Sequence, residues 1–413
     1  MEVRLVLQQR MTAPFVPAAA HVRRFLKSSA GGAFFLLLAS LAGFVLANSP
    51  WAAGYRTLTT LPLKFPFLGK RGPDNVAAWV SDGLMTLFFL VVILEIKKEI
   101  VSGHLSSLRR VALPLIGAVG GMVVPALTYL LVTWGHPEAT SGWAIPVATD
   151  AAFTLPIILA LGRRVSPGAR AWLMALAIFD DVLGIVVIAL FYGGSMYWPA
   201  LLAVVLVTAA LIGANRAGIR TLWAYGTGGI LLWTALLDSG LHPTLAGVIT
   251  GLCLPAGDAK GAATLDWVSS AVTPLVTWIV LPLFGFMNVG MSAAGMKPDM
   301  MLEAVPLGIM LGLMLGKPVG VFGATLLSIR LKVVMLPAGT STGMLFGLSL
   351  LCGIGFTISL FVANLAFSGS DLIAPAKMGI FAGSALSALT GWFWLRFMPQ
   401  NVTRPSEEGG FPR

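Results

Sequence analysis

WLMALAIFDDVLGIVVIAL (residues 172–190) is the stretch that decides the fold, because it places two adjacent carboxylates, Asp180 and Asp181, inside an otherwise apolar segment. As a helix, such a segment is about 30 Å long, roughly the thickness of the hydrocarbon core of a bilayer. A charged side chain at the bilayer centre costs about 3 kcal/mol on insertion scales, so intramembrane charges mark functional sites. Asp150 and Lys317 also lie in apolar segments. Together these residues predict an ion site inside a membrane.

The composition is that of a polytopic membrane protein. Of the 413 residues, 57% are hydrophobic and only 11% are charged, whereas soluble domains carry about 25% charged residues. The net charge of +10 does not indicate nucleic-acid binding, since the basic residues lie in short loops between apolar runs, where orientation signals belong. Cys253 and Cys352 both lie in apolar segments and are interpreted as helix-packing residues. No metal or cofactor site is predicted from the cysteines and the four scattered histidines.

Apolar windows of about 17 to 25 residues predict an all-α protein with twelve transmembrane helices. Most of the 27 basic residues fall on the side of both termini, which predicts that both termini are cytoplasmic. We expect a basic N-terminal tail at 1–30, one transporter domain at 31–398 and a C-terminal tail at 399–413. The helices are expected near 32–48, 78–96, 112–133, 143–162, 170–191, 198–214, 219–237, 240–255, 269–292, 302–328, 342–366 and 375–397.

Two of the expected spans are unsuited to a continuous helix. The fourth contains Pro146 and Pro156, and each proline removes a ladder hydrogen bond. The eleventh contains Gly353 and Gly355 close together. Free backbone groups at membrane depth are tolerated only inside protein or beside a watery cavity. Each interrupted span is the middle of a three-helix group, which is typical of an inverted-repeat transporter with its site between the breaks.

Simple kinks are the alternative interpretation, because glycine and proline are common in membrane helices. The polar residues at the breaks favour a site: Thr149 and Asp150 lie at the first break and Thr357 at the second. Half-helix ends are positive at their N-termini and negative at their C-termini. We therefore expect Asp150 to balance the positive ends and Lys317 to balance the negative ends.

Several motifs carry a family resemblance. ATDAAF (148–153), LMALAIFDDVLG (173–184), GKPVG (316–320) and CGIGFT (352–357) resemble the bacterial NhaA-type sodium/proton antiporters. So do three further segments, FFLVVILEIKKE (88–99), LHPTLAG (241–247) and LPLFGFMN (281–288). The likeness is collinear from about Arg24 to Arg396. It implies twelve helices, inverted three-helix repeats (spans 3–5 and 10–12) and crossed broken helices in a homodimer.

The resemblance also implies a function. A protein of this family is not an enzyme and needs no cofactor; it sits in the bacterial inner membrane and exchanges cytoplasmic Na⁺ or Li⁺ for external protons. Transport is expected to be electrogenic and regulated by pH. Asp181 resembles the main cation-binding carboxylate, and Asp180 resembles its neighbour, salt-bridged to Lys317. Thr149, Asp150 and Thr357 resemble the helix-break partners. The residues that resemble the pH-response cluster are Glu95, Glu99, Asp82, His242 and Asp266.

Four positions depart from the family pattern. Pro156 and Ile93 stand where glycine is expected, and Trp267 and Ser270 stand where histidines are expected. These departures bear on the second half of the fourth span and on the details of the pH response, not on the ion site.

The residues themselves suggest a mechanism. A carboxylate that is buried beside a like charge favours its protonated form, and a small hard cation prefers oxygen ligands. A proton and Na⁺ would therefore compete for Asp181. Three other functions remain open from the residues alone. They are an intramembrane aspartyl protease that uses Asp150 and Asp181, a sodium-coupled solute symporter of related fold, and a passive cation channel.

Overall fold

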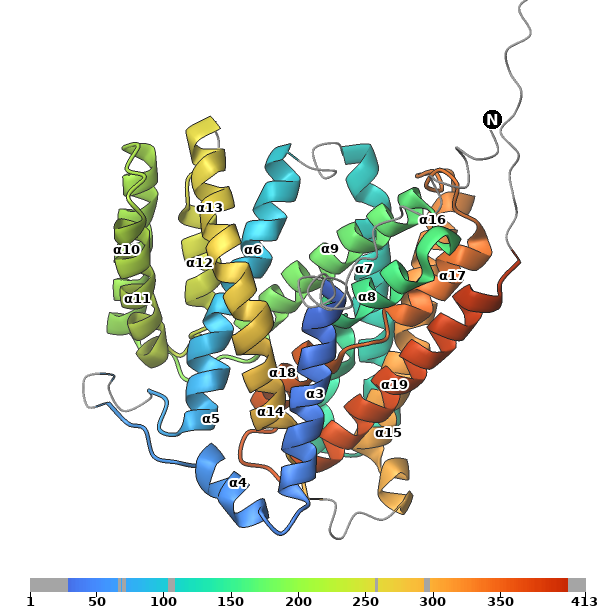
Figure 1. Ribbon diagram of the computed structural model, residues 1–413, viewed down its shortest axis with the longest axis horizontal. Coiled ribbons are helices and arrows are strands. Elements are labelled where there is room, and N and C mark those ends of the chain that lie inside the picture. The colour runs from blue at the N-terminus through green and yellow to red at the C-terminus, as the bar shows by residue number, and fades with distance from the viewer. Residues whose placement is uncertain are drawn as a thin grey trace, which may run out of the picture.

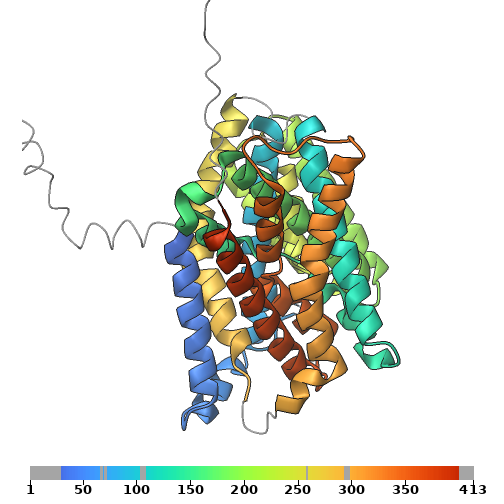
Figure 2. The ribbon, with the colours of Figure 1, turned by 90° about the vertical axis from the view of Figure 1, so that its right-hand side faces the viewer.

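The computed structural model describes residues 29–65, 68, 72–102, 108–256, 259–292 and 298–399. Nearly all of the predicted N-terminal tail and of the C-terminal tail lies outside the described residues. Within them the chain is helical, apart from one isolated antiparallel bridge between Pro62 and Asn75. The helices form one bundle, seen from two directions in Figures 1 and 2.

Most helix bounds lie within a few residues of the predicted windows, but α13 begins well before the window 269–292 and α12 is shorter than the window 240–255. Helices marked η are 3₁₀ or π turns. In chain order the elements are α3 (Ser29–Ala47), α4 (Ala52–Thr59), α5 (Val76–Ala78), η2 (Trp79–Leu84), α6 (Met85–Ser102), α7 (Leu108–Val132), η4 (Pro137–Val147), α8 (Ala151–Leu161), η5 (Gly162–Arg164), α9 (Pro167–Phe191), α10 (Trp198–Arg216), α11 (Leu222–Ser239), α12 (Leu245–Cys253), α13 (Ala259–Leu275), η6 (Val276–Val280), α14 (Leu281–Val289), η7 (Pro298–Leu302), α15 (Ala304–Leu311), η8 (Gly312–Gly316), α16 (Lys317–Arg330), α17 (Thr342–Leu351), α18 (Phe356–Ala366) and α19 (Ile373–Phe397).

Among the described residues, nine helices are long and apolar enough to cross a membrane, and α17 with α18 adds a tenth span if the bent pair is counted as one. The other two predicted spans correspond to α11 and to α12, which has only nine residues. Figure 1 shows α10 to α13 on one side of the bundle and α7, α15, α16, α17 and α19 on the other, with α18 between them. On this second side α7 packs along α9 and α16, and α19 packs along α15 and α17.

Both predicted interruptions are present. In the fourth span, a 3₁₀ helix (η4) ends at Val147, residues 148–150 are extended or irregular, and α8 begins at Ala151. Pro146 lies at the end of η4, whereas Pro156 lies inside α8 and does not end it. In the eleventh span, α17 and α18 meet at an angle of 46° across residues 352–355.

Three π-helical turns, η2, η6 and η8, interrupt otherwise regular helices. The sequence interpretation did not anticipate them. A π turn adds one residue to a turn, so it changes the direction of the side chains on either side, and such turns are frequent at functional sites. The turn η8 lies directly before Lys317 and Pro318.

Candidate ion-binding site

The two interrupted helices meet at their breaks. The backbone N–H of Asp150 donates to the carbonyl of Ile354 at 2.6 Å, which ties one break to the other. Glycine is required at Gly353, because a Cβ atom there would overlap the Leu313 carbonyl and the Ser387 side chain. The low steric bulk of this residue allows the backbones to approach closely enough to cross.

Asp150 lies between the N-termini of two half-helices. Its Oδ1 accepts a hydrogen bond from the N–H of Ala152 at 3.1 Å, at the start of α8. Its Oδ2 accepts from both the N–H (2.8 Å) and the hydroxyl (2.5 Å) of Thr357, at the start of α18. Asp150 is only 2% exposed. Its negative charge therefore faces two positive helix ends, as an anion at a helix N-terminus does.

Lys317 is fully buried and pairs with Asp180. Its Nζ lies 2.6 Å from Asp180 Oδ2 and also donates to the carbonyl of Val147, the last residue of η4. The ammonium group thus neutralises a buried carboxylate and lies at the negative end of one half-helix. Removal of one partner of such a buried ion pair strongly destabilises the folded protein, because the remaining charge has no water to solvate it.

Thr149 links this ion pair to the second break. Its hydroxyl lies 2.6 Å from Asp180 Oδ2 and 2.8 Å from the carbonyl of Cys352, which follows α17. A hydroxyl has one proton, so it donates to one of these acceptors at a time. The protonation state of Asp180 can therefore select which of the two contacts Thr149 makes as a donor.

Asp181 lines a cavity of about 210 Å³ together with Asp150 and Glu95. Oδ1 of Asp181 is buried and has no hydrogen-bond partner, and the same is true of Oδ1 of Asp180. An unpaired buried polar atom costs about 1 to 3 kcal/mol. Na⁺ prefers oxygen ligands, and the unpaired carboxylate oxygens of Asp180 and Asp181 are donors of the kind that suits a small hard cation.

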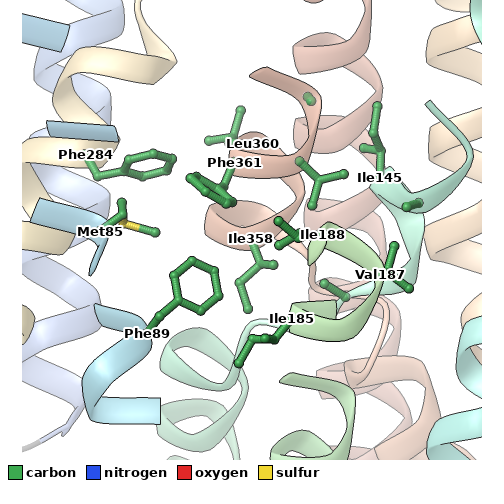
Figure 3. Close-up of a cluster of buried hydrophobic side chains, with 14 of the residues drawn as sticks. Met85, Phe89, Ile145, Ile185, Val187, Ile188, Phe284, Ile358, Leu360 and Phe361 are labelled. Carbon is green, nitrogen blue, oxygen red and sulfur yellow. The ribbon is translucent and has the colours of Figure 1, made fainter. Parts of the chain in front are cut away.

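An aromatic layer closes the other side of the site. Phe361 of α18 lies with its ring centroid 5.5 Å from that of Phe89 and 6.3 Å from that of Phe284, and Figure 3 shows these rings with Ile358 beside them. All three rings are buried. Along the chain, Phe89 lies between Asp82 and Glu95, and of these two acidic residues only Glu95 lines the cavity.

The residues predicted to form a pH-response cluster do not come together. Glu95 lines the cavity, and Lys98 one turn further along α6 forms an ion pair with Asp266 at 2.8 Å. Asp82 lies about 20 Å from Glu95 along the helix. His242 is near Asp82, with 3.8 Å between Nε2 and Oδ1. The structure thus separates these residues into two groups at opposite ends of α6.

The departures from the family pattern have local explanations. Ile93 is buried and packs against Gly251 of α12, where a Cβ atom would overlap the Ile93 side chain. Trp267 is 60% exposed and lies on the surface beside Asp266.

Two serines near the site were not predicted from the sequence. Ser359 donates to the carbonyl of Ile145 at 2.7 Å, and Ser384 accepts from the N–H of Gly355 at 3.2 Å. These serines satisfy backbone groups that the breaks leave free. Single serines in apolar helices have no spacing that distinguishes them, so no sequence signal would have found them.

Two interrupted helices joined at their breaks, beside a buried Asp–Lys pair and a cavity lined by Asp150, Asp181 and Glu95, define a membrane transporter of small cations. The sequence matches the family described as Na⁺/H⁺ antiporter 1 over residues 23–395. The chain belongs to this family.

Curated relatives match it over nearly their whole length. The Na(+)/H(+) antiporter NhaA of Gluconacetobacter diazotrophicus is 77% identical over 92% of this chain and 98% of its own. The NhaA antiporters of Zymomonas mobilis and Escherichia coli are 59% and 42% identical over 91% of this chain, and over 97% and 98% of theirs. The predicted resemblance is confirmed, and with it the class: the chain is a transporter and not an enzyme.

Proposed function

We propose that this protein exchanges cytoplasmic Na⁺ or Li⁺ for external protons, and that the proton and the cation compete for Asp181. The observation that carries the proposal is the buried, unpaired carboxylate oxygen of Asp181 at the wall of the cavity, next to the Asp180–Lys317 pair. One site that holds either ion performs exchange without a separate gate for each.

The topology that fits this function has twelve spans, with α11 and α12 as the seventh and eighth. Spans 3–5 and 10–12 would form two inverted repeats that carry the site, and the remaining spans would form a panel that mediates a homodimer. The excess of basic residues on the side of both termini supports a cytoplasmic location of the termini in the bacterial inner membrane. In this topology Glu95, which lines the cavity, lies toward the cytoplasmic end of α6, so we infer that the cavity is reached from the cytoplasm.

The ion pair offers a route for a second proton. When Na⁺ enters beside Asp181, its positive charge repels the Lys317 ammonium and attracts the Asp180 carboxylate. Lysine buried without a fixed partner loses its proton readily, so breaking the pair releases one proton in addition to that of Asp181. Two protons per monovalent cation make the exchange electrogenic.

Alternating access then requires two movements. The aromatic layer formed by Phe361, Phe89 and Phe284 opens on the external side, and the cavity beside Glu95 closes. The breaks at residues 148–150 and 352–355 are suited to move together, because backbone and side-chain hydrogen bonds already join them.

The test is the response of purified protein in sealed liposomes that contain a pH-sensitive dye. Addition of external NaCl or LiCl is expected to change the internal pH without any organic solute. A symporter would need a solute for the same signal, and a channel would give Na⁺ flux without coupled proton movement. Cleavage of a model transmembrane peptide would instead indicate a protease.

We propose that the five residues predicted to govern the pH response divide into two groups with different roles. Glu95 lines the cavity, Glu99 follows it on α6, and Asp266 pairs with Lys98 of the same helix. The charges of this group would attract cations and report cytoplasmic pH. Asp82 and His242 lie at the opposite end, where the imidazole Nδ1 lies 2.7 Å from the Thr244 hydroxyl. His242 belongs to the loop between α11 and α12 and is 9% exposed.

His242→Gln is expected to leave the midpoint of the activity–pH curve in place. Burial lowers the pKa of His242 from 6.5 to about 4, so the ring is neutral between about pH 6 and pH 9. Any stability that the neutral ring contributes is present above pH 6.5 and is lost as the pH falls toward 4. Glu95→Gln is the comparison and is expected to move the midpoint. A shifted midpoint in His242→Gln would show that this ring titrates in the working range.

A further inference from the structure

The helix that carries Lys317 contains a carbonyl with no donor in its own helix. In the π turn η8, the N–H of Lys317 donates to the carbonyl of Gly312, five residues earlier. By the same pattern the carbonyl of Leu313 would accept from residue 318, but Pro318 has no N–H. The donor of an ordinary α-helix, the N–H of Lys317, is already used. The Leu313 carbonyl is therefore unsatisfied by its own helix.

A serine from another helix supplies the missing donor. Ser387 of α19 is 1% exposed, and its hydroxyl donates to the Leu313 carbonyl at 3.4 Å. One turn earlier on α19, Ser384 accepts from the N–H of Gly355 at the second break. Gly353 lies directly against the same Leu313 carbonyl. The helix α19 thus binds backbone groups of both the π turn and the break.

Two hydrogen-bond patterns are available to this turn. In the observed π pattern, the Ser387 hydroxyl donates to the Leu313 carbonyl and the N–H of Lys317 donates to the Gly312 carbonyl. In the α pattern, the N–H of Lys317 would move to the Leu313 carbonyl, and the turn would lose one residue. Because each residue of a helix turns by about 100°, this change would rotate the Lys317 side chain away from Asp180 and Val147.

We propose that Ser387 is a positioning residue for Lys317: by satisfying the Leu313 carbonyl it keeps η8 in the π pattern, which aims the ammonium group at Asp180. Ser387 touches neither the transported ion nor the ion pair. The inference rests on the proposed role of Lys317 in transport, and it adds α19 to the elements that set the ion site.

The test compares Ser387→Ala with Ser349→Ala in proteoliposomes. Ser349 is also fully buried, but its hydroxyl donates to Leu345 within its own helix, α17, so its removal leaves no carbonyl of another helix unpaired. Ser387→Ala is expected to shift the pH profile of Na⁺-driven proton movement and to raise the apparent KM for Na⁺ by about tenfold. Removal of a residue that orients the ligands of an ion site without touching the ion has an effect of this size. Ser349→Ala is expected to keep the wild-type profile and KM.

A second background separates positioning from general stability. In Lys317→Gln, the further change Ser387→Ala is expected to have no additional effect on the pH profile, because there is no ammonium group left to aim. If Ser387→Ala does not fold, Ser387→Cys, with its weaker donor, is measured instead and is expected to give a smaller shift in the same direction. A wild-type profile and KM in Ser387→Ala, or in Ser387→Cys when only that variant folds, would overturn the inference. An inactive wild-type protein would overturn the proposed function itself.

Discussion

Asp181→Asn is expected to abolish Na⁺-driven proton movement in proteoliposomes, by about 100-fold or more. Asparagine keeps the shape of the side chain but carries neither the charge that binds the cation nor the proton that is exchanged. A contact with a charged group is worth up to about 3 kcal/mol, which corresponds to about a 100-fold change in rate or affinity. The initial rate of the dye signal after addition of NaCl measures this.

Asp299→Asn is the matched control for this change. Asp299 is also an aspartate, but it lies on the short helix η7, is exposed and lies outside the cavity lining. It is expected to keep wild-type transport. Retained exchange in Asp181→Asn, with folding and insertion unchanged, would reject Asp181 as the site of competition.

Removal of either partner of the Asp180–Lys317 pair is expected to lower the free energy of unfolding by about 3 to 5 kcal/mol, because the remaining charge is buried without compensation. Lys317→Gln leaves a carboxylate unpaired, and Asp180→Asn leaves an ammonium group unpaired. The double variant removes both charges and is expected to recover much of this loss. Denaturant unfolding in detergent micelles, followed by tryptophan fluorescence, measures all three.

Non-additivity is the diagnostic result. Residues in direct contact show coupling energies of about 0.5 to 3 kcal/mol in double-mutant cycles. Because Lys317 Nζ lies 2.6 Å from Asp180 Oδ2 and both residues are buried, we expect a coupling energy near the upper end of this range. Strictly additive losses would mean that Asp180 and Lys317 do not stabilise each other in the folded protein. Lys317→Gln is also expected to reduce the charge moved per cation, if Lys317 carries the second proton.

The large elements of the fold could be predicted because apolar length is visible in the sequence. The windows near 170–191, 198–214 and 375–397 match α9, α10 and α19 within a few residues. Apolar length was misleading for one span: residues 240–255 are mostly apolar, yet α12 spans only Leu245–Cys253, because Pro243 and Pro255 limit it. Hydropathy indicates whether a segment is buried in an apolar environment, but it does not indicate at which residue the helical hydrogen bonds begin.

The charged residues of the site could be predicted because burying a charge is costly enough to need a reason. Asp150 and Lys317 were expected at half-helix ends, and the structure places Asp150 at two N-termini and Lys317 at the C-terminal end of η4. The C-terminal end of α17 instead meets the Thr149 hydroxyl. Neutral hydroxyls cost little to bury once bonded, so their sequence signal is weak.

The irregular geometry could not be predicted. The π turn before Lys317 follows from Pro318 only when a donor for Leu313 is available, and that donor comes from α19, more than sixty residues later. The division of the pH-response residues into two groups likewise depends on how α6 runs through the bundle. Such features depend on contacts between helices, and periodicity within one helix does not contain them.

Proton release on cation binding tests the central claim most directly. Purified protein in weakly buffered detergent solution is titrated with NaCl or LiCl, and the pH change and the binding isotherm are recorded together at several starting pH values. Competition at Asp181 predicts that protons appear in solution as the cation binds, and that the apparent affinity rises about tenfold per pH unit for the Asp181 proton alone, and more steeply where Lys317 also releases its proton. Binding with an affinity independent of pH and with no released protons would contradict the account.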